Sequence, residues 1–421
     1  MVKMRIIGVM TGNSMDAIDV VLTEFDGEKM RDICSYSVPY SSEQKEQIDG
    51  FKRRVVAQKM TATDILKDNN FIDLHWQYIN GVAEAVNAMC RENNLQKAKI
   101  EAIGFHGKTL DHYPPSMAKI YGGKPFTTQM GSAQLLANLT GIPVINDFRS
   151  ALIMNGFEGA PLAGPHNAHI ATMEGDGCYY NAGNTGNLAW IKDGKLQISW
   201  DSGPFNEYVD QYVLRSVGQT MDFDGKYGKK GKILPDLLQK LFDLCREYYE
   251  MLPPKSGDPS YYHTSELLTH LAVTYKDKDF ADVVRTLEYF AAYTAVYALA
   301  QTPKNVQIEP NFILFGGGWK NPVVLKSFKD LLTKNDSFVL SEHHEMFTVL
   351  RLCMGKRPEI KYSDFGTYME ARLMADLARY YLLQKVWPLP ELNGKKMILG
   401  QARFPFAAKV DDFLSSAARG W

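Results

Sequence analysis

Asp201 is the residue whose setting best suits acid or base chemistry. It follows an expected strand at 196–200 and precedes a tight turn at 202–204, so its carboxylate is expected to project at a strand end. A general base needs such a position, because it must reach a water or hydroxyl and take its pKa from its surroundings. An aspartate there could instead cap the following helix by accepting backbone N–H groups. The local sequence alone favours the cap and leaves the base open.

Three loops of small residues could hold a phosphate. Residues 11–14 and 183–187 each turn from one expected strand into the next, where small residues let backbone N–H groups approach an anion closely. Residues 316–318 join a strand to a helix that begins at Asn321-Pro322. Each loop alone is a weak signal, but the three together indicate a nucleotide site. Asp16 and Asp19, beside the first loop, could position magnesium through water or simply close the turn.

The elements around the first two loops form an internal repeat of strand, turn, strand, Asp-Gly hairpin and strand. Such a repeat predicts a duplicated α/β domain, and two unrelated β-meanders are the alternative. The first copy comprises strands at 5–10, 18–25 and from about 31, with Asp26-Gly27 between the last two, and the second comprises strands at 178–181, 188–192 and 196–200, with Asp193-Gly194 between the last two.

Helices and short strands are expected between and after the two copies. Because no flexible linker interrupts the pattern, we expect a first domain over residues 1–147 and a second over 148–421. The expected helices are at 71–91, 129–139 and 281–301, and the expected strands are at 99–105, 142–146 and 311–315.

Composition excludes several classes of protein. The 421 residues suit two domains, and 45% apolar with 23% charged residues is typical of a folded globular protein. A net charge of -1 without charge runs argues against nucleic-acid and membrane-surface partners. Five scattered cysteines form no CxxC pair, which fits a reducing compartment. The longest apolar run, 289–300, is too short to span a membrane. We therefore expect a cytoplasmic protein.

Many segments, in order along nearly the whole chain, are similar to short motifs known from one group of kinases. Residues 8–19 look like the loop G-L-M-S-G-T-S-L-D-G-x-D, and 106–109 are similar to H-G-Q-T. Residues 200–206 resemble F-D-T-G-P-G-N, and 315–321 match C-G-G-G-x-x-N. With these motifs the chain resembles the anhydro-N-acetylmuramic acid kinase family. Further matches are 129–131, 139–142 and 147–149 with Q-I-G…TGI…DFR, 159–162 with G-A-P-L, 224–231 with D-G-x-x-A-x-x-G, 254–257 with P-K-S-T-G, and 369–371 with M-E-A.

The resemblance implies two RNase H-like domains of the actin-like ATPase fold around a central cleft, in a homodimer that uses ATP and Mg²⁺. In such an enzyme the aspartate matching Asp201 activates a water that attacks the anomeric carbon. The 1,6-anhydro bond opens, and the freed 6-oxygen takes the γ-phosphate to give N-acetylmuramic acid 6-phosphate in cell-wall recycling. The end of the chain is expected to pack back on the first domain.

The resemblance also assigns residues to ligands. Asp201 is the catalytic base, and Asp16 and Asp19 hold the metal through water. The residues assigned to the nucleotide are Thr11, Gly12, Asn13, Ser14, Met15, Asp16, Ala17, Asp19, Gly183, Asn184, Gly186, Asn187, Gly316, Gly317, Gly318 and Asn321. Those assigned to the sugar are His106, Gly107, Lys108, Thr109, Arg149, Glu158, Asn206 and Glu370.

Several positions depart from the family pattern, mostly near the sugar or the phosphates. Lys108 and Glu158 each replace a glutamine, Phe157 and Phe205 each replace a glycine, and Asn184 begins a loop that lacks the usual G-G. We expect Lys108 to pair with Glu158, two charges replacing two amides. The other possibility for Lys108 is that it binds phosphate or a substrate carboxylate directly. Two functions are alternatives to the family's activity. One is a divergent kinase acting on another anhydro- or amino sugar, and the other is a catalytically silent regulator that binds nucleotide or sugar. The retained Asp201 argues against the silent regulator.

Overall fold

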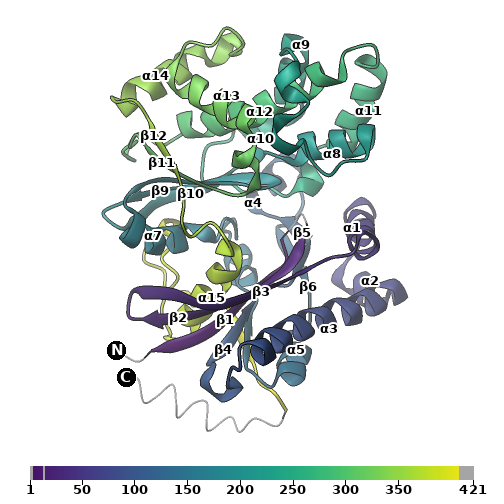
Figure 1. Cartoon of the computed structure of the whole chain (residues 1–421), viewed down its shortest axis with the longest axis vertical. Helices are drawn as coiled ribbons and strands as arrows, with labels where there is room; N and C mark the ends of the chain where they lie inside the picture. The colour runs from purple at the N-terminus through teal and green to yellow at the C-terminus, as the bar shows by residue number, and fades with distance from the viewer. Residues whose placement is uncertain (1–2, 13–14, 407–421) are drawn as a thin grey trace. The chain divides into compact units, whose positions relative to one another are not determined.

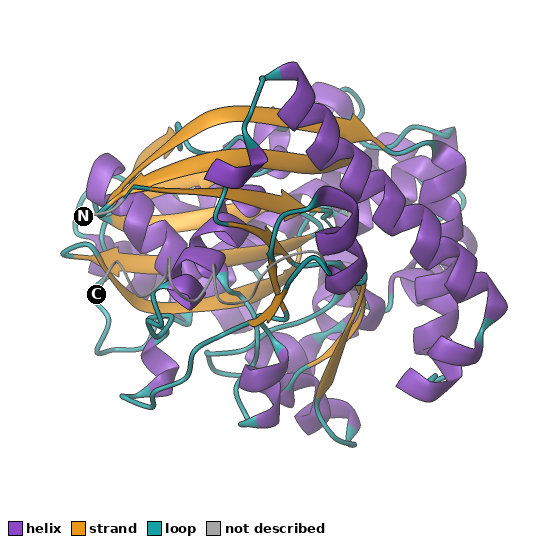
Figure 2. Cartoon of the chain, turned by 90° about the horizontal axis from the view of Figure 1, so that it is seen from below, coloured by secondary structure: helices purple, strands orange, loops and turns teal. Residues whose placement is uncertain are grey.

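The computed structural model describes residues 3–12 and 15–406, which divide into two compact units (Figure 1). The first unit takes its residues from Met1–His112, Pro125–Gly159 and Thr367–Trp421, and the second from Tyr113–Lys124 and Ala160–Gly366. Both units contain helices and strands, which Figure 2 colours purple and orange. The predicted boundary between a first domain over residues 1–147 and a second over 148–421 stays a prediction.

In the described part of the chain, the first unit is built on a six-stranded sheet with the order β13-β7-β4-β1-β2-β3. Strands β1, β2 and β3 are antiparallel, β4 is parallel to β1, and β7 is parallel to β4. A two-stranded sheet pairs β5 with β6. The bounds are β1 Met4–Met10, β2 Ala17–Asp26, β3 Lys29–Pro39, β4 Ala102–Phe105, β5 Lys108–Tyr113, β6 Phe126–Met130, β7 Val144–Asn146 and β13 Gln401–Arg403.

The second unit repeats this plan in a sheet with the order β10-β9-β8-β11-β12. Its first three strands are again antiparallel and its last two parallel. The shared order and directions are those of RNase H-like domains, so the predicted duplication is confirmed. The bounds are β8 Gly177–Ala182, β9 Thr185–Lys192, β10 Lys195–Pro204, β11 Asn311–Phe315 and β12 Glu359–Tyr362.

The hairpin between β9 and β10 shows how local sequence sets this topology. Lys192 pairs with Lys195, which leaves Asp193 and Gly194 as a two-residue loop with φ angles of 52° and 64°. Two positive φ angles in succession define the type I′ turn that Asp-Gly favours. The sequence signal and the observed register agree.

Two glycines of the first sheet allow a helix to lie directly on it. A Cβ at Gly8 of β1 would lie 1.7 Å from the carbonyl oxygen of Ala371, and one at Gly104 of β4 would lie 2.0 Å from that of Met374. Both carbonyls belong to α15, Met369–Leu382. Any side chain at these glycines would therefore push α15 off the sheet.

The remaining helices surround the two sheets. The longest in the second unit, α12 (Phe280–Ala300), is buried on nearly every side, as its apolar sequence predicts. The helices of the first unit are α1 Ser42–Ala57, α2 Ala62–Lys67, α3 Asn69–Glu92, α5 Ala133–Thr140 and α6 Ser150–Met154. The others of the second are α4 Pro115–Tyr121, α7 Ala163–Glu174, α8 Glu207–Val217, α9 Pro235–Leu244, α10 Arg246–Glu250, α11 Thr264–Thr274, α13 Pro322–Thr333 and α14 His344–Met354.

One predicted helix, at 129–139, begins later than expected. Gln129 and Met130 end strand β6, and α5 starts at Ala133 after Ser132, whose hydroxyl accepts from the N–H of Leu135. The apolar spacing continues through both segments, so the sequence pattern does not mark the change from strand to helix. The serine cap does mark it.

Candidate active site

Asp201 lies inside strand β10 rather than at its end, because the strand continues to Pro204. It is 5% exposed and opposes Asn187 of β9. Its Oδ2 accepts from the backbone N–H of Gly257 at 3.1 Å, and its own N–H donates to the carbonyl of Lys255 at 3.0 Å. The N-cap of the following helix α8 is Asn206. The structure therefore contradicts the helix-cap interpretation of Asp201.

The loop between β8 and β9 is tied to the end of β10. The carbonyl of Gly183 accepts from the N–H of Asn206 at 3.1 Å, and that of Asn184 from the N–H of Phe205 at 2.8 Å. A Cβ at Gly186 would lie 2.4 Å from Oγ of Ser202. The structure thus brings Gly183, Asn184, Gly186, Asn187 and Asn206 together around the strand that carries Asp201.

The three glycines after β11 differ in their surroundings. Gly316 has φ 93°, and a Cβ there would lie 2.5 Å from the carbonyl oxygen of Ala182. A Cβ at Gly318 would lie 2.4 Å from Oδ1 of Asn206. A Cβ at Gly317 would meet nothing within 4 Å. Gly316 and Gly318 therefore have no room for a side chain, whereas Gly317 faces open space.

Asn321 is the N-cap of α13, and the buried carboxyl group of Glu288 orients its side chain. Its Oδ1 accepts from the N–H of Val323 at 2.9 Å, and its Nδ2 donates to Oε1 of Glu288 at 2.6 Å. Burial raises the pKa of Glu288 to about 8, the Asn321 amide opposes the rise, and nearby Asp222 adds to it. A Cβ at Gly228 would lie 1.7 Å from Oε2 of Glu288. Sequence reasoning missed Glu288, because a lone acid in an apolar helix carries no motif.

In the first unit, the loop after β1 is held by its flanking residues. The Thr11 hydroxyl bonds the hydroxyl of Tyr78 at 2.8 Å, and the N–H of Met15, at φ 50°, donates to the carbonyl of Gly12 at 3.2 Å. The turn therefore brings Thr11, Gly12 and Met15 together. Asn13 and Ser14 lie outside the described residues.

Two aspartates follow this loop. Asp16 is exposed and pairs with Lys45 at 3.6 Å, Ala17 begins β2, and Oδ1 of Asp19 accepts from the hydroxyl of Ser37 at 2.7 Å. Burial raises the pKa of Asp19, the Ser37 hydroxyl opposes the rise, and Asp16 adds to it. A divalent cation held through water would offset this mutual repulsion, so the pair fits the magnesium role.

His106 and Arg149 form a buried pair in the first unit. Nε of Arg149 donates to Nε2 of His106 at 2.7 Å, and Nδ1 of His106 lies 2.9 Å from the carbonyl of Gly107. These partners fit the neutral Nδ1–H tautomer. Burial, with a smaller contribution from the charge of Arg149, lowers the pKa of His106 to about 3. The imidazole is therefore neutral at physiological pH.

Lys108 is buried beside the first loop. Its side chain is 1% exposed, and its Nζ donates to the carbonyl of Gly12 at 3.2 Å and pairs with Asp49 at 4.0 Å. No sequence motif pointed to Asp49. The predicted pair between Lys108 and Glu158 stays a prediction. Thr109 follows in β5.

Two glutamates complete the residues assigned to the sugar. Glu158 lies near enough to Glu391 to raise the pKa of that carboxyl, beyond the larger effect of burial. Glu370 is the second residue of α15, and it is exposed to solvent. Surrounding protein atoms raise the pKa of Glu370, Asp19 adds to the rise, and Arg149 opposes it. Asp19, Arg149 and Glu370 therefore share one electrostatic neighbourhood.

Comparison of the sequence with known proteins identifies the family of this chain. The sequence model described as anhydro-N-acetylmuramic acid kinase matches residues 4–344. The anhydro-N-acetylmuramic acid kinase of Paramagnetospirillum magneticum is 32% identical over 395 residues, which cover 93% of this chain and 96% of that protein. The corresponding protein of Nitrobacter winogradskyi is 29% identical over 332 residues, 78% of this chain and 84% of that protein.

Similar solved structures are more distant. Component A of (R)-2-hydroxyglutaryl-CoA dehydratase from Acidaminococcus fermentans has a TM-score of 0.42 at 10% identity, covering 88% of this chain and 96% of that one. The ROK hexokinase of Thermus thermophilus has a TM-score of 0.34 at 14% identity, covering 88% and 97%. Scores this low add nothing to the argument.

The two RNase H-like sheets and the family match define an ATP-dependent sugar kinase of the actin-like class. The chain belongs to the anhydro-N-acetylmuramic acid kinase family. Among the described helices, none combines the length and the apolar character that crossing a bilayer requires.

Proposed function

We propose that this kinase opens the 1,6-anhydro ring of anhydro-N-acetylmuramic acid and phosphorylates the 6-oxygen with ATP. Family membership supports the substrate, and the orientation of Asp201 by the N–H of Gly257 is the observation that carries the mechanism. A donor on Oδ2 favours the ionised carboxylate, which is the form that can accept a proton.

The reaction balances with Asp201 as the base. The carboxylate takes a proton from water as the water oxygen bonds to the anomeric carbon. The bond between that carbon and the bridging oxygen breaks, and its electron pair stays on the 6-oxygen. This oxygen attacks the γ-phosphorus, ADP leaves, and Asp201 releases its proton to solvent in the course of turnover.

The glycine loops would hold the nucleotide. Gly317 offers open space where the chain turns from β11 toward α13, so a nucleotide backbone can pass there closely. Asp16 and Asp19 would hold Mg²⁺ through water, and a bound ion would neutralise charge on the phosphates. The Glu288–Asn321 hydrogen bond would fix the start of α13 beside the nucleotide.

The polar residues of the first unit would bind the sugar. His106 orients Arg149 by accepting from its Nε, and the Arg149 guanidinium suits the carboxylate of the lactyl group. Lys108 places a cation near the first loop, where the family pattern has a glutamine, and this departure supports a second candidate, a related kinase for another anhydro-amino sugar. We further propose a cytoplasmic homodimer that acts in peptidoglycan turnover.

The test is an assay in ¹⁸O-labelled water with ATP, Mg²⁺ and anhydro-N-acetylmuramic acid. We expect N-acetylmuramic acid 6-phosphate with ¹⁸O at carbon 1, detected by mass spectrometry. The same assay with 1,6-anhydro-N-acetylglucosamine, which lacks the lactyl group, separates the two candidate substrates. ADP formation without a phosphorylated sugar would exclude both candidates.

A further inference from the structure

Lys255 is a buried lysine whose ammonium is surrounded by neutral oxygen acceptors. It is 1% exposed, and its Nζ donates to three backbone carbonyls, at 2.9 Å to Tyr248, 2.8 Å to Tyr249 and 2.8 Å to Met251. A fourth contact, at 3.0 Å, is with Oε1 of Gln301. The ammonium also lies 5.0 Å from the centroid of the Tyr248 ring.

The position of these carbonyls explains why a cation is buried there. Tyr248 and Tyr249 belong to the short helix α10, and Met251 is its C-cap, so their carbonyls include groups that an ending helix leaves without partners. A cation at a helix C-terminus also interacts favourably with the helix dipole. Burial lowers the pKa of Lys255 to about 7, whereas four acceptor oxygens favour the protonated form.

The segment that follows from Lys255 holds Asp201 on two sides. The carbonyl of Lys255 accepts from the N–H of Asp201, and the N–H of Gly257 donates to its Oδ2. Between them, Ser256 exchanges two hydrogen bonds with the side chain of Ser116, at 2.7 and 3.3 Å. The backbone of residues 255–257 is thus fixed on both sides of the proposed base.

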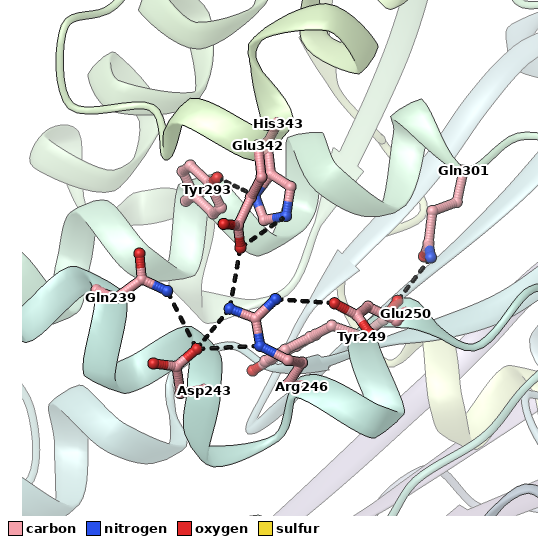
Figure 3. A network of polar contacts seen from close by, with 9 residues as sticks. All are labelled: Gln239, Asp243, Arg246, Tyr249, Glu250, Tyr293, Gln301, Glu342 and His343. Atoms are coloured by element: carbon pink, nitrogen blue, oxygen red, sulfur yellow. Dashed lines mark hydrogen bonds and ion pairs between the residues drawn. The ribbon is translucent and has the colours of Figure 1, made fainter.

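Tyr248 provides a second connection to the same aspartate. Its carbonyl accepts from Lys255, and its hydroxyl donates to the carbonyl of Asp201 at 2.8 Å. Gln301, the C-cap of α12, joins the arrangement, because its Nε2 donates to the carbonyl of Tyr249 at 2.6 Å (Figure 3).

Helix α10 itself is anchored by a charged network at its first residue. Arg246 binds Asp243 at 2.6 Å, Glu250 at 2.9 Å and Glu342 at 2.9 Å, as Figure 3 shows. The same figure shows His343 directed at the hydroxyl of Tyr293. With its first residue held by this network, α10 gives Lys255 a fixed set of carbonyls to bind.

We propose that Lys255 is a positioning residue for Asp201, whose ammonium fixes the end of α10 and the turn at 255–257 so that Gly257 and Tyr248 hold the aspartate in place. The proposal rests on the proposed function only in taking Asp201 as the base. Lys255 has no part in proton transfer, and its effect reaches the substrate through hydrogen bonds to Asp201. A misplacement of the base by about 1 Å can cost on the order of 100-fold in rate.

The experiment compares Lys255→Met, which keeps the length of the side chain and removes its charge, with Lys326→Met on the exposed face of α13. We expect Lys255→Met to lower kcat by about 10- to 100-fold with the Kd for ATP within about twofold. In protein labelled with ¹⁵N-glycine, the Gly257 amide proton, assigned from a Gly257→Ala spectrum, should move upfield as its hydrogen bond lengthens. Lys326→Met should leave all three quantities unchanged. Unchanged kcat and an unchanged Gly257 resonance in Lys255→Met would overturn the proposal.

Gln301→Met provides the test if Lys255→Met does not fold, because it removes one acceptor of the ammonium and one donor to Tyr249. It should shift the Gly257 resonance in the same direction and lower kcat by about 3- to 10-fold. No change in either quantity overturns the proposal. The Gly257 resonance does not depend on catalysis. A shifted resonance together with an active Asp201→Asn variant would therefore reject Asp201 as the base while keeping Lys255 as the group that positions it.

Discussion

The backbone N–H of Gly257 points at Oδ2 of Asp201, with 3.1 Å between nitrogen and oxygen. A rigid donor on one oxygen fixes the plane of the carboxylate, and strand β10 fixes its backbone. Asp201 can therefore be replaced by asparagine, which has nearly the same shape, so that the effect on the rate reports the loss of the carboxylate.

Asp201→Asn should abolish most phosphoryl transfer and leave ATP binding intact. The amide cannot accept the proton from water, but its oxygen can still accept from Gly257. The loss expected for a general base is about 10²- to 10⁴-fold in kcat. Steady-state kinetics and calorimetric titration with ATP check this result. Asp193→Asn, in the exposed β9–β10 turn, is the control, and near-normal turnover by Asp201→Asn would reject the mechanism.

Gly317→Val should weaken ATP binding without lowering stability. A Cβ at Gly317 meets nothing within 4 Å, so the valine fits the free protein but occupies the space proposed for the nucleotide. Gly316→Val should instead lower the Tm, because its Cβ would meet the Ala182 carbonyl at 2.5 Å. Calorimetry and thermal melts distinguish the two variants. Unchanged ATP affinity in folded Gly317→Val would place the nucleotide elsewhere.

Two double-mutant cycles test which acidic residue pairs with Lys108. If Lys108 and Glu158 act as a pair, Lys108→Gln and Glu158→Gln should each lower kcat/KM, and the double variant should recover part of the loss, with a coupling of about 1 kcal/mol or more. The matching cycle with Asp49→Asn tests the ion pair that the structure shows at 4.0 Å. Coupling to Asp49 alone would contradict the pair with Glu158.

His106 should make the fold sensitive to acid. Its pKa is about 3 in the folded chain and about 6.5 when unfolded, so between these values the unfolded chain binds more protons. The free energy of unfolding therefore falls as the pH drops from about 6.5 toward 3. Urea titrations at pH 7 and pH 5 should show His106→Gln losing about 2 kcal/mol less than the unmodified protein. His344→Gln, at an exposed position, is the control, and equal losses in all three proteins would contradict the prediction.

Most strands of the two large sheets could be predicted because their signals are local, but the edge strands β12 and β13 were not predicted. Asp193-Gly194 sets the turn between β9 and β10, and Asn321-Pro322 sets the start of α13. Phe126–Met130 could not be recognised as a strand, because its state depends on pairing with β5, which precedes it by more than ten residues.

Sequence motifs predicted only part of the candidate site. Asp201 and the glycine loops carry recognisable patterns, but the partner that orients Asp201 lies at Gly257, and the acceptors of Lys255 include Gln301 on another helix. Asp49 meets Lys108 from α1, far away in the sequence. Such contacts arise only when distant segments pack together, and no single segment encodes them.

The contact of α15 with Gly8 and Gly104 sets an order of completion during synthesis on the ribosome. Strands β1 and β4 are made early, but the helix that lies on them begins at Met369. All residues of the second unit have been made once Gly366 is added. The second unit therefore has its whole chain available before the first, although the first contains the earlier strands. A nascent chain halted before Thr367 would contain every residue of the second unit. It would lack α15, the helix that packs on Gly8 and Gly104 of the first unit.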